Sequence, residues 1–155
     1  MTVKSRLLEL LEQHKGETLS GEDIGRELSC TRAAVWKAVN SLRQEGYPIE
    51  AGPNKGYMLA RESNLISAEG IRLFLEDPQV EIKIFDAISS TNLEARQLAV
   101  SGMAGHGSFV VAMEQTAGRG RRGREFYSPK GSGIYLSVIL EPKGTLEGSL
   151  LITTA

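Results

Sequence analysis

The spacing of apolar residues changes near the middle of the chain, and this change limits the possible folds. Before about residue 60, apolar residues recur every three or four positions, as in Val35, Ala38, Val39 and Leu42, which is the spacing of amphipathic helices. Beyond about residue 80, strand-length apolar runs such as SFVVAM and GIYLSVIL alternate with a helical segment. The pattern predicts an α+β protein made of two units.

Composition excludes several classes of protein. With 155 residues and 41% hydrophobic side chains, the chain has enough apolar material for a packed core. One cysteine, Cys30, excludes an intrachain disulfide framework, and two histidines in separate segments provide little for a metal site. The apolar runs are too short to cross a bilayer, and the opening residues lack the pattern of a signal peptide. We therefore expect a cytoplasmic protein with no membrane partner and no metal-ligating residues.

Residues 1–60 have the pattern of a winged helix-turn-helix domain. Helix ends are predicted at Gly16 and Gly46, and helix starts at Ser20 and Thr31. About three residues separate the second and third helices, which is the spacing of a helix-turn-helix. Two short strand-like runs, YPIEA and GYMLA, then flank the turn-rich GPNKG. The alternative is a plain three-helix bundle whose hairpin has no role in DNA binding.

The third helix of this domain carries side chains suited to DNA. Polar and basic residues that match phosphates and base edges lie at its start and on its exposed positions: Thr31, Arg32, Lys37, Asn40 and Arg43. Lys55 adds a cation at the hairpin tip, whereas the spacing leaves open whether Trp36 packs inside or contacts DNA. Residues 1–60 hold eight basic and eight acidic side chains, which argues against strong nonspecific binding. We predict a DNA-binding domain.

Residues 61–66 are predicted to be a linker, and residues 67–155 a second domain built on a sheet. A helix capped by Ser67 and ended by Pro78 opens this domain, and another is expected over 91–100. Three strand-like runs, EIKIFDAI, SFVVAMEQ and GIYLSVIL, alternate with these segments. Three strands with so little cover would leave apolar surface and a strand edge unpaired, so we expect the chain to be the front portion of a longer protein.

A glycine- and arginine-rich stretch, GRGRRGREFYSPKGSG at 118–133, connects the last two strand runs. Residues 114–130 hold five basic and two acidic side chains, although the net charge of the chain is only -1. Glycine allows backbone N–H groups to turn toward an anion, and guanidinium groups match phosphate or carboxylate. Because strands fix both ends, we predict a loop that becomes ordered over an anionic ligand. The alternative is a loose segment that contacts nucleic-acid phosphates.

Polar residues at two other strand ends are candidates for the same ligand site. Thr91 and Glu94 fit a capping box, and with Ser90 they form a helix start that presents N–H groups and hydroxyls to a small molecule. Capping alone and ligand binding explain this motif equally well. Gln115 offers both amide donors and a carbonyl acceptor, and Phe126 either stacks on a base or joins the core.

Three motifs of the second domain, SSTNLEA, EQTAGRGRRGR and SPKGSGIYLSVIL, together resemble the first half of the catalytic core of biotin–protein ligases. The preceding SGEDIGRELSCTRAAVWKAVNSLRQEGYPIEA is similar to the winged helix of the bifunctional bacterial form, which also represses biotin synthesis genes. The resemblance covers essentially the whole chain. It implies formation of biotinyl-AMP from biotin and ATP with magnesium, and transfer of biotin to a lysine of a biotin carboxyl carrier protein. It also implies operator DNA as a partner and a ligand-promoted homodimer.

The resemblance further implies roles for individual residues. Six residues would contact biotin: Ser90, Thr91, Asn92, Gln115, Gly118 and Arg119. The nucleotide would contact Arg121, Arg122 and Phe126, while Arg119 and Arg121 would act in catalysis by facing the carboxylate and the phosphate. Phe126 stands where the family usually has a tryptophan that stacks on adenine, so we expect weaker nucleotide binding.

Part of the family's active site lies beyond these 155 residues, since its catalytic lysine lies on later strands. We therefore expect little or no ligase activity from residues 1–155 alone. Two other functions stay open. One is a transcriptional regulator that senses an anionic ligand without ligase activity, and the other is a nucleic-acid-binding module in which the arginine-rich stretch contacts phosphates.

Overall fold

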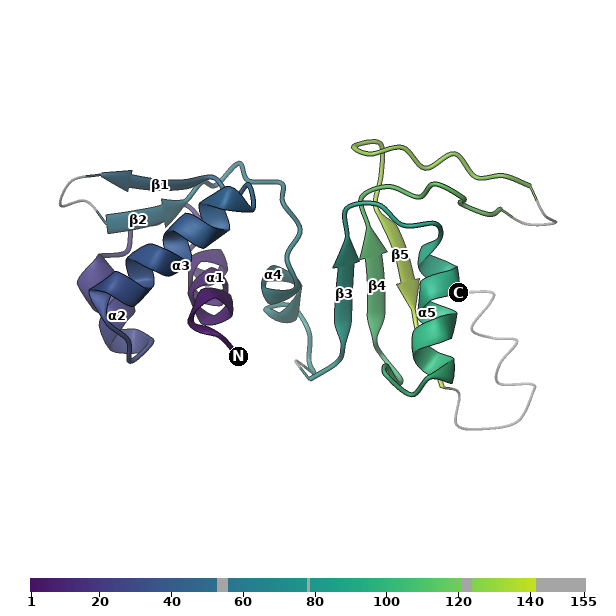
Figure 1. Ribbon diagram of the computed structural model, residues 1–155, viewed down its shortest axis with the longest axis horizontal. Helices are drawn as coiled ribbons and strands as arrows, with labels where there is room; N and C mark the ends of the chain where they lie inside the picture. The colour runs from purple at the N-terminus through teal and green to yellow at the C-terminus, as the bar shows by residue number, and fades with distance from the viewer. Residues whose placement is uncertain (53–55, 78, 121–123, 142–155) are drawn as a thin grey trace. The chain divides into compact units, whose positions relative to one another are not determined.

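Three helices near the N-terminus begin at hydroxyl side chains that cap them. In the computed structural model they are α1 (Val3–Gln13), α2 (Gly21–Glu27) and α3 (Arg32–Gln44) (Figure 1). Thr2, Ser20 and Thr31 each accept a hydrogen bond from a backbone N–H in the first turn, which satisfies a donor that the helix leaves unpaired. The predicted caps at Ser20 and Thr31 are confirmed.

The structure describes residues 1–52, 56–77, 79–120 and 124–141. The chain divides into two units, residues 1–78 and 79–155. Gly16 and Gly46, the predicted helix ends, both have positive φ angles, 85° and 94°, that a glycine adopts without a steric penalty. Over the described ranges, no helix combines the length and apolarity needed to cross a membrane.

A two-stranded hairpin follows α3, as predicted. Strand β1 (Ile49–Gly52) pairs antiparallel with β2 (Gly56–Leu59), so that Ile49 lies opposite Leu59. Leu19, in the connection before α2, pairs with the other edge of β2. It exchanges two backbone hydrogen bonds with Tyr57, at 2.9 and 2.8 Å. The tip with Lys55 lies outside the described residues.

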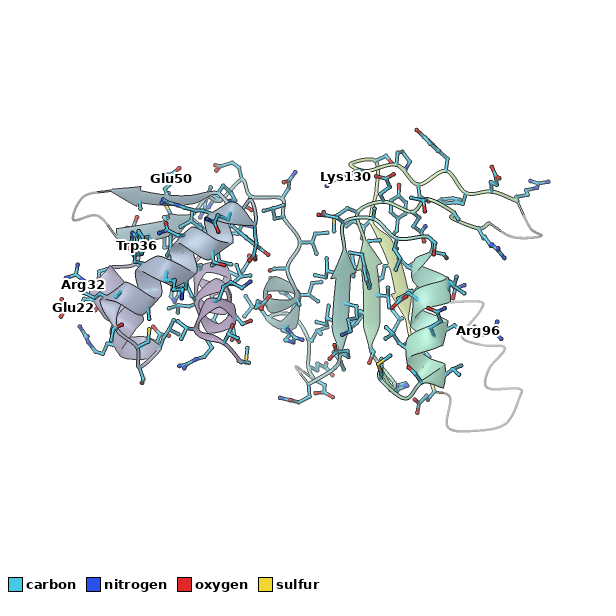
Figure 2. The ribbon with its side chains drawn as sticks, viewed as in Figure 1. Glu22, Arg32, Trp36, Glu50, Arg96 and Lys130 are labelled. Atoms are coloured by element: carbon cyan, nitrogen blue, oxygen red, sulfur yellow. The ribbon has the colours of Figure 1, made fainter. Side chains whose placement is uncertain are left out.

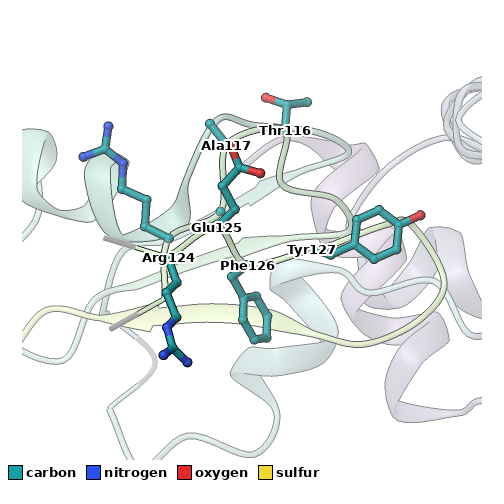
Figure 3. Close-up of a pocket in the computed structure, with 8 residues that line it drawn as sticks. Thr116, Ala117, Arg124, Glu125, Phe126 and Tyr127 are labelled. Carbon is teal, nitrogen blue, oxygen red and sulfur yellow. The ribbon is translucent and has the colours of Figure 1, made fainter. Parts of the chain in front are cut away.

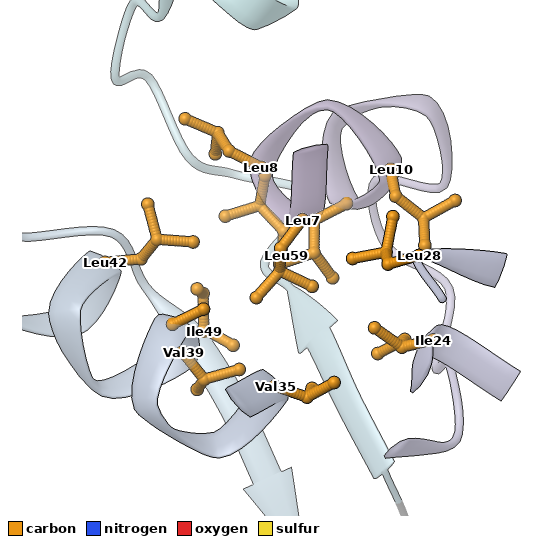
Figure 4. Packing of buried hydrophobic residues seen from close by; sticks show 12 residues of the cluster. Leu7, Leu8, Leu10, Ile24, Leu28, Val35, Val39, Leu42, Ile49 and Leu59 are labelled. Carbon is orange, nitrogen blue, oxygen red and sulfur yellow. The ribbon is translucent and has the colours of Figure 1, made fainter. Parts of the chain in front are cut away.

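The helices and the hairpin enclose one apolar core (Figure 4). The predicted apolar stripe of α3 is buried in it, together with leucines of α1, one residue of α2 and the residue at its C-terminal cap, and one residue from each strand of the hairpin. These residues are Leu7, Leu8, Leu10, Leu11, Ile24, Leu28, Val35, Ala38, Val39, Leu42, Ile49 and Leu59. Burying a side chain of this size contributes about 1.5–3 kcal/mol relative to leaving it exposed. The hairpin therefore belongs to the core of the first unit, which is the arrangement of a winged helix.

The helix after the predicted linker is shorter than expected. Ser67 caps it, as predicted, by accepting a hydrogen bond from Gly70 N at 2.9 Å. However, α4 spans only Ala68–Arg72, and the prediction that it would end at Pro78 is wrong. The backbone N–H of Phe74 bonds three residues back, which is the tighter turn in which α-helices commonly finish.

Helix α4 packs against α1 in the first unit, whereas the sequence assigned its residues to the second domain. The Ser67 hydroxyl donates to Glu12 Oε1 at 2.8 Å, and Lys15 Nζ in the same region donates to the Ser63 carbonyl at 2.8 Å. Burial, followed by the carboxylate of Glu69, raises the pKa of the nearby Tyr47 phenol. The predicted linker and the helix after it are thus fastened to the winged helix, while the predicted domain boundary at residue 67 stays a prediction.

In the described part of the second unit, a three-stranded sheet is covered by a helix (Figure 1). Its elements are β3 (Ile82–Phe85), α5 (Thr91–Val100), β4 (Phe109–Ala112) and β5 (Tyr135–Val138), in sheet order β3-β4-β5. Strands β3 and β4 are parallel and joined through α5, whereas β5 is antiparallel to β4. The helix packs on β4 and β5 over a small apolar cluster: Ala95, Leu98, Ala104, Val110 and Ile139. The predicted α+β class is confirmed.

Gly56 provides a test of how the hairpin seats on the helices. Its φ is +83°, and a Cβ atom there would collide with the Leu19 carbonyl. Gly46 has a similar φ, +94°, but open space around it. We expect Gly46→Ala to cost about 1–2 kcal/mol in the free energy of unfolding, from backbone strain alone. Gly56→Ala should lose about 1–3 kcal/mol more, because the hairpin must shift.

The measurement is urea unfolding of both variants followed by circular dichroism. If both variants lose the same free energy of unfolding, backbone strain alone explains the loss, and the close fit between Gly56 and Leu19 is contradicted.

Candidate functional site

The parallel pairing of β3 and β4 continues past both strands and brings two sequence motifs together. Ile88 forms a bridge with Gln115, and the backbone N–H groups of Thr116 and Ala117 donate to the carbonyls of Ile88 and Ser89 at 2.9 Å each. SSTN thus lies beside QTAGRG. Because α5 leaves β3 and returns to β4, its first turn stands at the carboxyl edge of these strands, where open α/β sheets bind ligands.

The side chain of Gln115 connects three segments at this edge. Its Oε1 accepts hydrogen bonds from the backbone N–H of Thr91 at 2.8 Å and from the Thr91 hydroxyl at 3.1 Å. Its Nε2 donates to the Ser128 hydroxyl at 3.1 Å, which in turn donates to the Phe126 carbonyl at 3.0 Å. The Ser137 hydroxyl of β5 donates to Thr91 Oγ1 at 2.9 Å. The Thr91 and Ser128 hydroxyls each donate one hydrogen bond and accept one from a side chain.

The predicted capping box of Thr91 and Glu94 is wrong. The cap position is Ser90, whose side chain makes no capping hydrogen bond, and Thr91 is the first residue of α5. The Thr91 hydroxyl is occupied by Gln115 and Ser137 instead, and Thr91 is only 4% exposed. Local spacing suggested a cap, but a partner 24 residues away in the sequence uses both polar groups of Thr91.

Gly118 is where the arginine-rich stretch leaves this network. A Cβ atom at Gly118 would lie 2.5 Å from the Phe126 carbonyl oxygen and 2.7 Å from Ser128 Oγ, so a side chain does not fit. Phe126 N donates to the Gly118 carbonyl at 2.9 Å, and Gly120 N donates to the Arg124 carbonyl at 2.7 Å. The two arms of the stretch are therefore paired. Its tip, with Arg121 and Arg122, lies outside the described residues.

Two clefts open around these arms, and Arg119 lines both of them. The larger, about 550 Å³, is lined by Arg124, Glu125, Phe126 and Tyr127 in addition to residues 116–119 (Figure 3). The smaller, about 360 Å³, is bordered on its other side by the start of α5: Ser89, Ser90, Asn92, Leu93 and Arg96. The guanidinium of Arg119 forms no ion pair with any described residue.

The structure therefore brings most of the predicted ligand-binding residues to one region. Ser90, Asn92 and Arg119 line the smaller cleft, and Phe126, which is 55% exposed, lines the larger. Thr91 and Gln115 lie behind them, in the hydrogen-bonded network. Sequence reasoning missed Ser128, which is 2% exposed, because a serine after two aromatic residues has no distinctive spacing.

The first unit presents a separate polar surface on α3. Arg32, which Figure 2 labels, and Lys37 are exposed and form no ion pair with a described residue. Asn40 is partly exposed. Thr31 uses its hydroxyl to cap α3, accepting from Ala34 N at 3.2 Å. Trp36, whose environment the sequence left open, is 61% exposed and so is not part of the core.

Arg43, which the sequence placed with these residues, is also exposed, and its side chain makes a structural contact as well. Its Nε donates to the Ile49 carbonyl at 2.8 Å, which ties the end of α3 to the first residue of β1. Arginine near the end of a helix commonly bonds to nearby carbonyl groups in this way. A contact of Arg43 with DNA stays a prediction.

Known families match both units. Residues 3–58 match the family described as an HTH domain, and residues 84–153 match the Biotin/lipoate A/B protein ligase family. The chain thus carries a segment similar to an HTH domain followed by a segment similar to the Biotin/lipoate A/B protein ligase family. The arrangement predicted from the sequence, a DNA-binding type of domain followed by part of a ligase domain, is thereby confirmed.

Individual relatives span nearly all of this chain. The chain is 40% identical over 154 residues to the bifunctional ligase/repressor BirA of Bacillus spizizenii. The aligned residues cover 98% of this chain and 47% of that protein. This chain is 38% identical over 137 residues to BirA of Escherichia coli K12, covering 88% and 41%. The chain thus spans about half the length of the curated relatives it matches. A crystal structure of biotin protein ligase from Leishmania major in complex with biotinyl-5-AMP matches 36% of this chain and 22% of that one, with 40% identity and a TM-score of 0.30.

Thr91 allows the hydrogen-bonded network to be tested. Thr91→Val keeps the shape of the side chain but leaves the Ser137 hydroxyl without its acceptor and removes one of the two hydrogen bonds that Gln115 Oε1 accepts, so it should reduce the local stability of α5 by about 1–3 kcal/mol. Thr91→Ser retains the hydroxyl and should lose less. Hydrogen exchange of the α5 amides measures this opening free energy. A Thr91→Ser variant as unstable as Thr91→Val would show that the methyl group, and not the hydroxyl, holds the helix.

Proposed function

We propose that this chain provides the DNA-binding part and the biotin-binding part of a bifunctional biotin–protein ligase and biotin repressor. The protein would make biotinyl-AMP from biotin and ATP and transfer biotin to a lysine of a biotin carboxyl carrier protein. One observation carries the proposal: Arg119 lines two clefts at once, one beside SSTN and the other beside Phe126. The similarity to bifunctional ligase/repressors supports it over a regulator that only senses its ligand.

In this proposal biotin occupies the smaller cleft and the nucleotide the larger. The smaller cleft, about 360 Å³, has the size of a small-molecule site and offers the hydroxyl of Ser90 and the amide of Asn92. The larger cleft offers the ring of Phe126, on which an adenine base would stack. Gln115 would take part through its amide nitrogen, which has a second proton besides the one donated to Ser128.

The reaction joins two anions, and this explains the role given to arginine. A biotin carboxylate oxygen bonds to the α-phosphorus of ATP while the bond to the departing pyrophosphate breaks. Fixed guanidinium groups reduce the repulsion and stabilise charge at the reacting phosphate, an effect that contributes several kcal/mol in comparable sites, about 3–4 for one donor. Arg119 stands between the two clefts, and we assign Arg121 and Arg122 to the same phosphates. A lysine amine then attacks the acyl carbon, and AMP leaves.

Magnesium would accompany ATP in this proposal. It binds proteins through one or two carboxylates and is otherwise held by substrate phosphates and water. Among the described residues around the larger cleft, Glu125 carries the only carboxylate. The described part of the chain contains no group of three or more residues able to hold a metal ion, so the phosphates of ATP would supply most of the binding.

Operator DNA would bind to α3, with Arg32 and Lys37 on phosphates, Asn40 toward base edges, and Thr31 and Lys55 beside the backbone. Arg32 and Lys37 are exposed and form no ion pair with a described residue, so they are available for phosphate contacts. We also propose a ligand-promoted homodimer in the cytoplasm, in keeping with the resemblance to the bifunctional bacterial ligases.

Arg119 is the residue that tests the ligand site. Arg119→Gln should weaken binding of a non-hydrolysable biotinyl-AMP analogue about 10- to 100-fold, because a charged hydrogen bond contributes about 1.5–3 kcal/mol. Arg26→Gln is the matched control, because Arg26 is an exposed arginine of α2 that lines neither cleft. Isothermal calorimetry with the analogue and with biotin alone measures both. Equal losses for the two variants, or no binding by the unmodified chain, would contradict the assignment.

The salt dependence of DNA binding separates the two basic regions. Replacing Arg32 or Lys37 by glutamine should weaken duplex binding and lower the slope of log K against log salt by about 1 per residue. Arg119→Gln removes the same charge and should leave the slope unchanged. If Arg119→Gln lowers the slope as much as Arg32→Gln does, the arginine-rich stretch contacts nucleic acid and the DNA assignment must be revised.

A further inference from the structure

Trp36 is the only tryptophan in the chain, and none of the functions assigned above uses it. The core-facing positions of α3 are Val35, Ala38, Val39 and Leu42, so Trp36 lies on the opposite side of the helix with 61% of its surface exposed. A single exposed apolar side chain is common on protein surfaces. The position of this one, and not its exposure alone, requires an explanation.

Trp36 stands in the middle of the polar row on α3. Arg32, Trp36 and Asn40 follow one another at intervals of four residues, which places them on one face of the helix, and Lys37 follows Trp36 in the sequence. Figure 2 labels Arg32 and Trp36 on α3. Neither Arg32 nor Lys37 forms an ion pair with a described residue, unlike Arg26, which lies 3.0 Å from Asp23, although Glu22 lines the same cleft as Arg32. An apolar ring between free cations suits a partner that is anionic at its rim and apolar at its centre.

Duplex DNA presents this combination in its major groove. Phosphates line the groove, and the C5-methyl group of thymine is an apolar group at the base edges, where contact with apolar side chains distinguishes it from other bases. We propose that Trp36 reads thymine, packing its indole ring against thymine methyl groups while Arg32 and Lys37 hold the flanking phosphates. The inference rests on the proposed DNA-binding function and adds a specificity-determining residue to it.

The first experiment uses Trp36 as its own probe. The full 155-residue chain is mixed with a duplex selected from a random-sequence pool by its binding to that chain. Since there is no other tryptophan, all indole emission comes from Trp36. We expect the duplex to change this emission and to protect it from quenching by acrylamide. Emission that instead changes with protein concentration in the absence of DNA would assign Trp36 to a contact between two chains and would overturn the proposal.

The second experiment removes the methyl groups one at a time by replacing thymine with uracil. At one or two positions the replacement should weaken binding about fourfold, the effect of one buried methyl group. In Trp36→Ala the same replacements should have no effect, and Trp36→Phe should restore part of it. Phe74→Ala is the matched control, because Phe74 is 90% exposed in the same unit and lies outside α3. It should bind as the unmodified chain does.

The outcomes separate this inference from the function on which it rests. Failure to bind any duplex would overturn both. Binding with unchanged Trp36 emission, or a uracil effect that persists in Trp36→Ala, would overturn the reading of thymine by Trp36 and leave the DNA-binding proposal intact. Circular dichroism of Trp36→Ala checks that the fold is retained, as its exposure predicts.

Discussion

The second unit depends on the two hydrogen bonds that Gln115 Oε1 accepts from Thr91. They connect the end of β4 to the first turn of α5, and through Ser137 the same network reaches β5. When either partner of a buried amide–hydroxyl pair is removed, the other is left without a hydrogen bond, which costs free energy of folding. The network therefore fixes the positions of its members. As a result, Gly118 begins the arginine-rich stretch from a rigid base, and both clefts take their shape from that base.

In the first unit, the corresponding constraint is the seating of the hairpin on the helices. Leu19 exchanges two backbone hydrogen bonds with Tyr57, and Arg43 fastens the end of α3 to Ile49. These contacts hold the apolar ends of β1 and β2 in the core. The outward side of α3 is thereby left to polar residues and Trp36, because every inward position is already occupied by the core.

The sequence predicted the features that depend on neighbours along the chain. The caps at Ser20, Thr31 and Ser67, the stripe of α3 and the extent of α5 each follow from local spacing. It also indicated which residues gather around the two clefts, since motif composition indicates polar strand ends. The errors have different physical origins. The Thr91 hydroxyl bonds to Gln115, 24 residues away, which local spacing does not reveal. Helix α4 ends at Arg72, although no proline or glycine marks that position in the sequence.

The distribution of ion pairs explains how a chain with a net charge of only -1 offers two cationic surfaces. Several cations are neutralised within the chain, as Lys4 is by Glu45 at 2.7 Å and Lys130 by Asp86 at 3.3 Å. Among the described residues, Arg32 and Arg119 form no such ion pair. Arg32 lies one helical turn before the exposed ring of Trp36, and Arg119 lines a cleft together with the exposed ring of Phe126. Other described arginines, such as Arg96, also form no ion pair, so an aromatic ring beside the cation is what the two surfaces share. A guanidinium without an internal partner is free to make a bidentate contact with phosphate, and both proposed ligands carry phosphate.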